Sequence, residues 1–307
     1  MKILLSGASS FTGFWFAKAL AEAGHQVTAP VRRSVNAYDG VRGQRTQRLC
    51  ALADVIEGVD FGSDGWLELL DDADVVCHHA ADVRDYRSEA FDIPAALADN
   101  TRRGAEMVER LADKGSYGLV ITGSVFEPDE GAGSLPLKAF SPYGQSKAFT
   151  SQMFEYWCDR AKLPVGKFVI PNPFGPFEEP RFTAYLLKTW RVGETPEVRT
   201  PDYVRDNIPV DLLALAYVRF VEEMAAREPR RHASPSGYIE SQGAFSQRFA
   251  QEMSSRLTMK CPLTQGQQTD FSEPLVRINR DPVARNHPTW SERKSWDDYA
   301  EYYRIRI

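Results

Sequence analysis

Short apolar runs alternate with longer amphipathic stretches through the first 170 residues of this 307-residue chain. The apolar runs have the length and composition of buried parallel strands, and the stretches between them have helical periodicity. Strands are expected at 3–6, 26–31, 53–59, 74–79, 118–122 and 166–171, and helices at 11–22, 64–70, 93–112 and 143–162. Regular alternation of strand and helix implies right-handed crossovers, so we expect an α/β fold with a doubly wound parallel sheet.

The alternation loosens after residue 172, where proline and glycine crowd into the segment 171–176. We therefore expect a first domain over residues 1–171 and a smaller α/β lobe over residues 172–307, some segments of which return to the main sheet. The segment 291–303 is rich in tryptophan and tyrosine and is expected to form a helix that packs on the body.

Composition excludes several classes of protein. Hydrophobic residues make up 43% of the chain and charged residues 26%, as in a soluble enzyme, and the net charge of -5 argues against a nucleic-acid-binding surface. No apolar run approaches the ~20 residues of a membrane span, and the start of the chain lacks a signal-peptide core, so a cytoplasmic location is expected. The four cysteines are scattered, and the adjacent His78 and His79 would point to opposite faces of a strand, so no metal site is predicted.

A glycine-containing turn, Gly7-Ala8-Ser9-Ser10-Phe11-Thr12-Gly13, follows the first expected strand and opens the first expected helix. Glycine at the end of a strand permits a tight turn, and Gly13 permits close packing of helix on strand. The amino terminus of the helix attracts a pyrophosphate. The turn predicts a dinucleotide site, although Ser10 stands where the middle glycine of such turns is found. The alternative is an ordinary strand-to-helix turn.

Two arginines, Arg32 and Arg33, end the second expected strand, where NAD-binding enzymes carry an acidic residue for the ribose hydroxyls. A guanidinium pair there can hold a 2′-phosphate through charge-assisted hydrogen bonds. The expected cofactor is therefore NADP, with NAD as the alternative; the competing interpretation is a solvated basic turn. Other strand ends expected near the cofactor are Asp60-Phe61 and His79-Ala80-Ala81.

Tyr143 and Lys147 are four residues apart on an expected helix and would share one face. An ammonium beside a phenol favours the phenolate, so we expect Lys147 to lower the pKa of Tyr143 and to suit it for general acid/base work. The spacing is common by chance. The strand upstream, however, ends in the hydroxyls of Thr122 and Ser124, which can hydrogen bond a reacting oxygen.

Taken together, these motifs resemble the extended short-chain dehydrogenase/reductases, also called the NAD-dependent epimerase/dehydratase family, which have a Rossmann sheet. The resemblance covers nearly the whole chain and is carried, in the family's order, by the glycine turn, Asp60, 79–81, Asn100, 122–124, Tyr143, Lys147, 172–176 and 205–211. Pro209 departs from the family's pattern, which commonly has His or Tyr at that place.

The resemblance implies roles for individual residues. Tyr143 would be the acid/base, Lys147 would lower its pKa and hold the nicotinamide ribose, and Ser124 would orient the substrate oxygen, with Thr122 as the substitute. Other residues expected against the cofactor, besides those of the turn and the strand ends above, are Asn100, Thr122 and Pro171. Asn172 and Arg205 would bind the phosphates of a nucleotide-linked sugar, and Arg181 and Arg277 are weaker candidates for the same task.

The sequence also narrows the reaction. Related sugar dehydratases carry an Asp-Glu pair directly after the strand hydroxyl, whereas Ser124 is followed by Val125-Phe126, and no histidine lies between His79 and His232 for a double epimerization. Reduction of a keto-sugar by NADPH remains, with 4-epimerization through a transient ketone as the alternative. A reductase of non-nucleotide carbonyls and a non-catalytic NADP-binding regulator stay open.

A homodimer is a further expectation from the resemblance, since relatives pack two helices from each subunit together. The corresponding helices, 93–112 and 143–162, carry apolar residues at Leu97, Met107, Leu111, Phe149, Met153 and Tyr156. The alternative is that these faces serve only the internal sheet.

Overall fold

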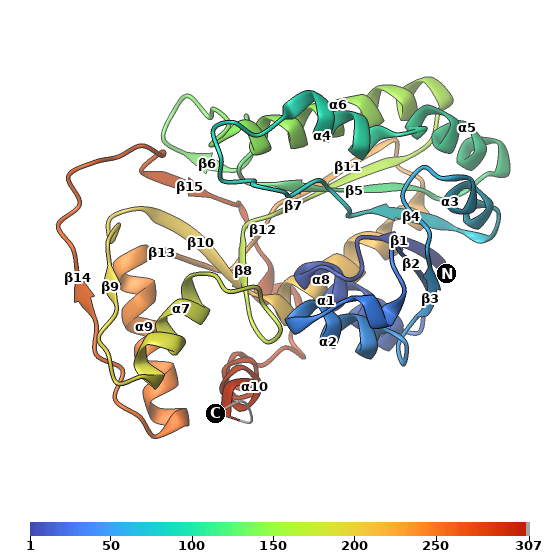
Figure 1. Ribbon diagram of the computed structural model, residues 1–307. Coiled ribbons are helices and arrows are strands. Elements are labelled where there is room, and N and C mark those ends of the chain that lie inside the picture. The colour runs from blue at the N-terminus through green and yellow to red at the C-terminus, as the bar shows by residue number, and fades with distance from the viewer. Residues whose placement is uncertain (305–307) are drawn as a thin grey trace.

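The computed structural model describes residues 1–304; residues 305–307, the end of the predicted second domain, lie outside the described part (Figure 1). Its main sheet has seven parallel strands in the order β11-β7-β5-β4-β1-β2-β3. The strands are β1 (Lys2–Ser6), β2 (Gln26–Val31), β3 (Asp54–Glu57), β4 (Val75–His78), β5 (Gly118–Ser124), β7 (Val165–Ile170) and β11 (Arg230–Ala233). The predicted α/β fold with a doubly wound parallel sheet is confirmed.

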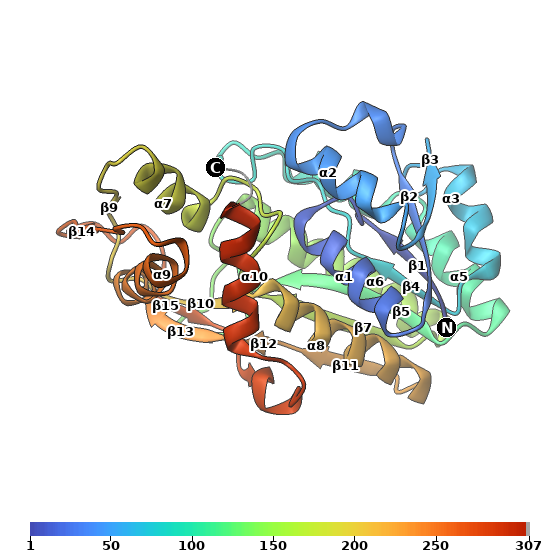
Figure 2. The ribbon, with the colours of Figure 1, turned by 90° about the horizontal axis from the view of Figure 1, so that it is seen from below.

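Helices cover both faces of this sheet, which explains why its strands are apolar on both sides (Figures 1 and 2). Along β1, Ile3 and Leu5 join one buried core, and Leu4 between them joins the other. The first core includes residues of α1 (Phe11–Glu22) and α8 (Val210–Glu223), and the second those of α3 (Asp64–Leu69), α5 (Gly104–Lys114) and α6 (Pro142–Ala161).

The strand order reverses between β1 and β4, because β2 and β3 lie on one side of β1 while β4, β5 and β7 lie on the other. In doubly wound sheets, ligands bind outside the carboxyl ends of the strands at such a reversal. The glycine turn after β1 and the segment 79–81 after β4 therefore meet where a dinucleotide site is expected.

The second lobe is built on a five-stranded mixed sheet, beside which lie the helices α7 (Phe182–Arg191) and α9 (Gln242–Leu257) (Figure 2). Its strands are β6 (Ala132–Gly133), β8 (Asn172–Phe174), β10 (Val204–Pro209), β13 (Tyr238–Ser241) and β15 (Val276–Ile278). Two-residue strands pair elsewhere as β9 (Glu197–Val198) with β14 (Thr264–Gln265) and β12 (Pro235–Ser236) with β16 (Asp281–Pro282). A third core joins Phe174 with α7, α9 and α10 (Glu292–Arg304).

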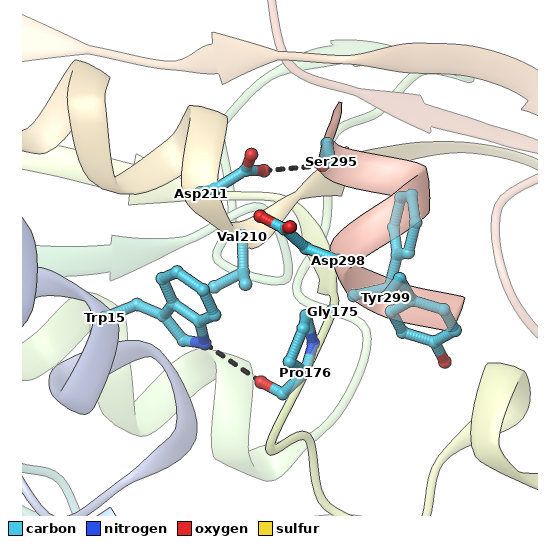
Figure 3. Close-up of a pocket in the computed structure, with 9 residues that line it drawn as sticks. Trp15, Gly175, Pro176, Val210, Asp211, Ser295, Asp298 and Tyr299 are labelled. Atoms are coloured by element: carbon cyan, nitrogen blue, oxygen red, sulfur yellow. Dashed lines mark hydrogen bonds between the residues drawn. The ribbon is translucent and has the colours of Figure 1, made fainter. Parts of the chain in front are cut away.

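The terminal helix α10, which the aromatic segment predicted, connects the lobe to the main domain. Asp211, at the start of α8, accepts hydrogen bonds from Trp290 (3.0 Å) and Ser295 (2.8 Å). On the other side of a small pocket, Trp15 of α1 donates to the carbonyl of Pro176 at 2.9 Å (Figure 3). These hydrogen bonds connect the two parts of the chain around the pocket, which is lined by none of the predicted catalytic residues.

Two helical expectations need correction. The helix expected over 93–112 is two helices, α4 (Ile93–Thr101) and α5, because Arg103 adopts a left-handed conformation at φ +52°. A helix not expected at all, α2 (Gly40–Leu49), follows β2. Its buried residues are Gly43, Arg45, Thr46 and Leu49, so the apolar periodicity that marks a helix in a sequence is absent.

The apolar residues proposed for a dimer face divide into two groups. Met107 and Leu111 are buried in the core of the main domain and Leu97 of α4 is partly buried, whereas Phe149, Met153 and Tyr156 form an exposed stripe on α6. Dimerization through this stripe stays a prediction. Among the described residues, no helix has both the length and the apolar character to span a bilayer.

Candidate active site

The first and last residues of the glycine turn, Gly7 and Gly13, have no room for a side chain. Gly7 has φ +74°, and a Cβ there would lie 2.8 Å from the backbone nitrogen of Ala80; a Cβ on Gly13 would lie 2.2 Å from the carbonyl oxygen of Gly7. Ser10 caps α1 by accepting a hydrogen bond from the amide of Gly13 at 3.1 Å. The first amides of a helix have no acceptor within it and can receive a phosphate, so the turn fits a dinucleotide pyrophosphate despite the serine.

His79 connects the glycine turn to the end of β5. Its Nε2 lies 3.1 Å from Ser10 Oγ and 2.9 Å from Thr12 Oγ1, and its Nδ1 lies 3.0 Å from Thr122 Oγ1. Desolvation, with the nearby Lys147 ammonium, lowers the pKa of His79 to about 3. The neutral ring therefore fixes three hydroxyls around the glycine turn, and the Thr122 hydroxyl is engaged in this structural contact.

His78 points to the other face of β4, as the sequence predicted. It contacts Ser6 Oγ at 3.1 Å and the Asn100 carbonyl at 2.9 Å, and its ring stacks on Phe61 at 4.1 Å. Asn100 is buried and accepts a hydrogen bond from the amide of Asp82 (2.8 Å), so it supports the backbone after β4.

The other residues proposed for the cofactor line the strand ends. Asp60, after β3, is partly exposed and accepts a hydrogen bond from the amide of Phe61; its carboxylate lies 3.6 Å from the Arg102 guanidinium. Ala80 donates its amide to Ser6 Oγ at 2.9 Å, Ala81 is partly exposed beyond it, and Pro171 is buried directly after β7.

Arg42 is a residue of this site that the sequence interpretation missed, because it lies on the unexpected helix α2. Its guanidinium donates to Ser9 Oγ at 2.8 Å and 3.2 Å and lies 5.2 Å from the centre of the Tyr38 ring. Desolvation lowers the pKa of Arg42, and the positive charge of Arg32 lowers it further. Arg33 is exposed, and its backbone amide, rather than its guanidinium, bonds the Tyr38 hydroxyl at 3.3 Å.

Two hydroxyls at the end of β5 were candidates for the third catalytic residue. Thr122 is engaged with His79 as described. Ser124 Oγ accepts one hydrogen bond, from the amide of Phe126 at 3.2 Å, which leaves its own proton and a lone pair for a substrate. The geometry favours Ser124.

Tyr143 and Lys147 lie on the first two turns of α6, which Ser141 caps through the amide of Gly144 (3.4 Å). The Tyr143 ring is partly exposed and lies edge-on to the rings of Tyr86 (5.7 Å) and Phe91 (5.9 Å). These two aromatic residues come from the segment between β4 and α4 and screen the phenol from solvent.

We expected Lys147 to lower the pKa of Tyr143, but the pKa of Tyr143 is raised. Desolvation and then the Glu127 carboxylate raise the pKa of Tyr143, and Arg181 only partly opposes them. Desolvation also lowers the pKa of Lys147 to about 8, since the ammonium is buried. Tyr143 is therefore a neutral phenol.

Glu127 is the second residue that the sequence interpretation missed. Its side chain is fully buried, one carboxylate oxygen accepts the amide of Ser124 at 2.7 Å, and the other lies 2.7 Å from the Lys167 ammonium. The sequence signal was the single acidic residue three positions after Ser124, outside the Asp-Glu pattern of the dehydratases.

The arginines proposed for a substrate diphosphate differ in their availability. Arg277 is fully buried and donates to the carbonyls of Val125, Glu127, Glu130 and Lys138. Arg205 donates to three carbonyls and pairs with Glu273 at 2.7 Å. Both were expected to bind the substrate, but in the structure the Arg205 guanidinium binds groups of the second lobe and the Arg277 guanidinium binds the segment after β5.

Arg181 and Asn172 complete the proposed substrate residues. Arg181 is exposed at the start of α7, lies 6.0 Å from the Tyr86 ring and acts electrostatically on Tyr143, so it faces the reacting centre. Asn172 of β8 is partly buried and donates to the carbonyl of Asp206 at 3.3 Å.

Comparison with known protein families identifies the family of the chain. A family model described as "NAD dependent epimerase/dehydratase family" matches residues 3–233. No curated protein sequence matches the chain significantly.

Solved structures share the fold over the whole chain. The UDP-glucuronic acid 4-epimerase of Bacillus cereus, in complex with a fluorinated UDP-sugar and NAD, has a TM-score of 0.77 at 16% identity, with 100% of each chain covered. The UDP-glucose 4-epimerase of Stenotrophomonas maltophila, with bound NAD, has a TM-score of 0.75 at 18% identity, covering 100% of this chain and 98% of that one. A dTDP-glucose 4,6-dehydratase of Streptomyces venezuelae has a TM-score of 0.71 at 15% identity, with 99% and 97% covered.

Proposed function

The chain belongs to the NAD-dependent epimerase/dehydratase family. We propose that it is an NADP-dependent oxidoreductase that reduces a keto group, and that the substrate is a nucleotide-linked sugar. The observation that carries the proposal is the arrangement at the carboxyl edge of the sheet. Tyr143 shares the first turns of α6 with the buried Lys147, and the hydroxyl of Ser124, whose proton is available, ends the strand β5.

Different residues of the candidate site would bind the cofactor, orient the substrate and transfer the proton. The glycine turn, Arg32, Arg42 and Lys147 would hold NADPH, which supplies the hydride when bound. Ser124 would donate a hydrogen bond to the carbonyl oxygen of the substrate and so orient it. Tyr143 would give its proton to that oxygen as negative charge develops there, which is general acid catalysis. Lys147, once charged, would stabilise the phenolate that remains.

The cofactor preference can be tested through a matched pair of arginines. Arg42→Ala is expected to weaken NADPH binding about tenfold or more and to leave NADH binding nearly unchanged, since a charge-assisted hydrogen bond contributes roughly 1.5–3 kcal/mol. Arg33→Ala removes an equal charge from the exposed segment after β2 and should have a small effect. Calorimetric titration measures all four affinities. Equal affinity of the unaltered protein for NADPH and NADH would contradict the preference.

The nucleotide part of the substrate is supported by the family and by the ligands of the structural neighbours. Saturating UDP or dTDP should then raise Tm by several degrees, because a ligand at 100 times its Kd stabilises the folded state by about 2.7 kcal/mol. The substitution Arg181→Met should reduce this protection if Arg181 meets the diphosphate.

A second candidate is reduction of a carbonyl that carries no nucleotide. It is favoured by the internal hydrogen bonds of Arg205 and Arg277, which leave Arg181 as the one of the three proposed substrate arginines that faces the reacting centre. Under this alternative, neither UDP nor dTDP protects the protein from heat, whereas NADPH still does.

A further inference from the structure

One buried arginine connects the glycine turn to the segment that leads to Arg181. Arg45 of α2 is fully buried, and its Nε donates to the carbonyl of Ser9 at 3.0 Å. One terminal nitrogen of the guanidinium donates to the carbonyl of Phe177 at 2.7 Å, and the other pairs with the carboxylate of Glu179. A single side chain therefore holds two segments that lie far apart in the sequence.

The second of these segments, residues 175–181 between β8 and α7, is called the strap below. Phe177 of the strap has φ +67°, a left-handed conformation that is unfavourable for a bulky side chain. The centre of its ring lies 5.3 Å from that of Phe14 on α1 and 4.6 Å from that of Tyr302 on α10. Such a conformation persists only where the surroundings enforce it, and here they include the hydrogen bond from Arg45.

The strap ends near the reacting centre. Arg181, its last residue, lies at the N-cap of α7 and donates its amide to the carbonyl of Glu179 at 2.6 Å. The Arg181 guanidinium lies 6.0 Å from the centre of the Tyr86 ring, which in turn lies 5.7 Å from the centre of the Tyr143 ring. The place of Arg181 against these two rings depends on the residue that Arg45 holds.

At the other end of the connection, α2 holds Ser9 at two points. Arg42 donates to the Ser9 hydroxyl at 2.8 Å and 3.2 Å, while Arg45 donates to the Ser9 carbonyl. Ser9 is buried and belongs to the turn that fits a dinucleotide pyrophosphate. A ligand that fixes this turn therefore also fixes a partner of Arg45.

We propose that Arg45 is a positioning residue that couples the glycine turn to the strap, so that a dinucleotide bound at the turn also orders the strap and holds Arg181 against Tyr86. The guanidinium suits this task because its planar fork donates in fixed directions to three acceptors at once. The inference rests on the proposed function for the binding of NADP at the turn and for the role of Arg181 toward a substrate.

Hydrogen exchange followed by peptide mass spectrometry measures the coupling, because amides exchange slowly where a segment rarely opens. Two regions are followed with and without saturating NADPH: the turn at residues 7–13, and residues 177–186 of the strap and α7. In the unaltered protein, NADPH should slow exchange about tenfold at the turn and about fivefold at the strap. This measurement requires neither a substrate nor turnover.

Glu179→Gln is the test variant. Arg45→Met would remove a fully buried guanidinium with all its hydrogen bonds, whereas Glu179 is half exposed and glutamine keeps an oxygen that accepts from Arg45. Glu252→Gln is the matched control, because it removes an equal charge from an arginine pair on α9. The Tm of both variants verifies that they fold. In Glu179→Gln, NADPH should still slow exchange at the turn but should slow it less than about twofold at the strap.

The cofactor-free variants test the coupling independently of NADPH. Glu179→Gln should speed exchange about fivefold at the strap and about twofold at the turn, and Glu252→Gln should change neither. Unchanged exchange at the turn or the strap in Glu179→Gln would overturn the proposal. Equal slowing of the strap by NADPH in Glu179→Gln and in the unaltered protein would overturn it too, since the cofactor would then act on the strap without Arg45. If NADPH slowed exchange in neither region, the proposed function would fail, and the cofactor-free variants would still decide the coupling.

Discussion

Tyr143→Phe is expected to lower turnover by about 10²–10⁴-fold, because the substitution deletes the hydroxyl that donates the proton to the developing alkoxide. The phenyl ring keeps its edge-on contacts with Tyr86 and Phe91, so the fold and the affinity for NADPH should change little. Steady-state kinetics, together with Tm and calorimetric NADPH binding, measures the three quantities. A variant that kept more than about a tenth of the activity would show that another group donates the proton.

The hydroxyls of Ser124 and Thr122 supply the matched control for this variant. Ser124→Ala should lower turnover with little effect on NADPH affinity, because the Ser124 hydroxyl is left free for the substrate. Thr122→Ala should act mainly on stability, because its hydroxyl is bonded to His79. The reverse ranking in turnover would keep Tyr143 as the acid and would move the orienting role to Thr122.

Arg277→Met is expected to destabilise the protein by about 3–5 kcal/mol, which corresponds to a fall in Tm of roughly 10 °C. The guanidinium is fully buried and donates to four carbonyls of the segment after β5, so its loss leaves those carbonyls without their donor. Arg181→Met removes an equal charge from an exposed position and should change Tm by less than about 2 °C.

The comparison of these two arginines separates a structural role from a substrate role. If Arg277→Met left Tm unchanged and weakened substrate binding alone, the Arg277 side chain would not form its internal hydrogen bonds in the protein in solution. The assignment of Arg277 to the fold would then be wrong. Thermal unfolding followed by circular dichroism measures the Tm of both variants and so distinguishes the two roles.

Much of the fold was predictable because its signals are local. The strands β1, β2 and β4 are short apolar runs buried on both faces, and the turn after β1 needs glycine at Gly7 and Gly13 for steric reasons that a sequence displays directly. The spacing of Tyr143 and Lys147 on one helix is equally local. These features depend on few neighbours, so the chain reveals them without a structure.

The features that escaped prediction depend on contacts between distant segments. Helix α2 buries Arg45, whose partners include the carbonyls of Ser9 and Phe177. A charged residue therefore occupies a buried helix position at which an apolar residue would have indicated the helix. The commitment of Arg277 depends on a segment about 140–150 residues earlier in the chain. The raised pKa of Tyr143 likewise depends on burial and on Glu127, neither of which the spacing of Tyr143 and Lys147 reveals.

We propose that this site moves hydride from NADPH to a ketone, with Tyr143 as the acid. The most direct test mixes the protein with NADPH deuterated at the transferring position and a panel of ketones, including keto-sugars with and without a nucleotide, and follows the products by mass spectrometry. We expect an alcohol that carries the deuterium, in an amount equal to the NADPH oxidised, and almost none with Tyr143→Phe. Interconversion of two sugar epimers with the deuterium left on the cofactor, or oxidation of NADPH without a labelled product, would contradict it.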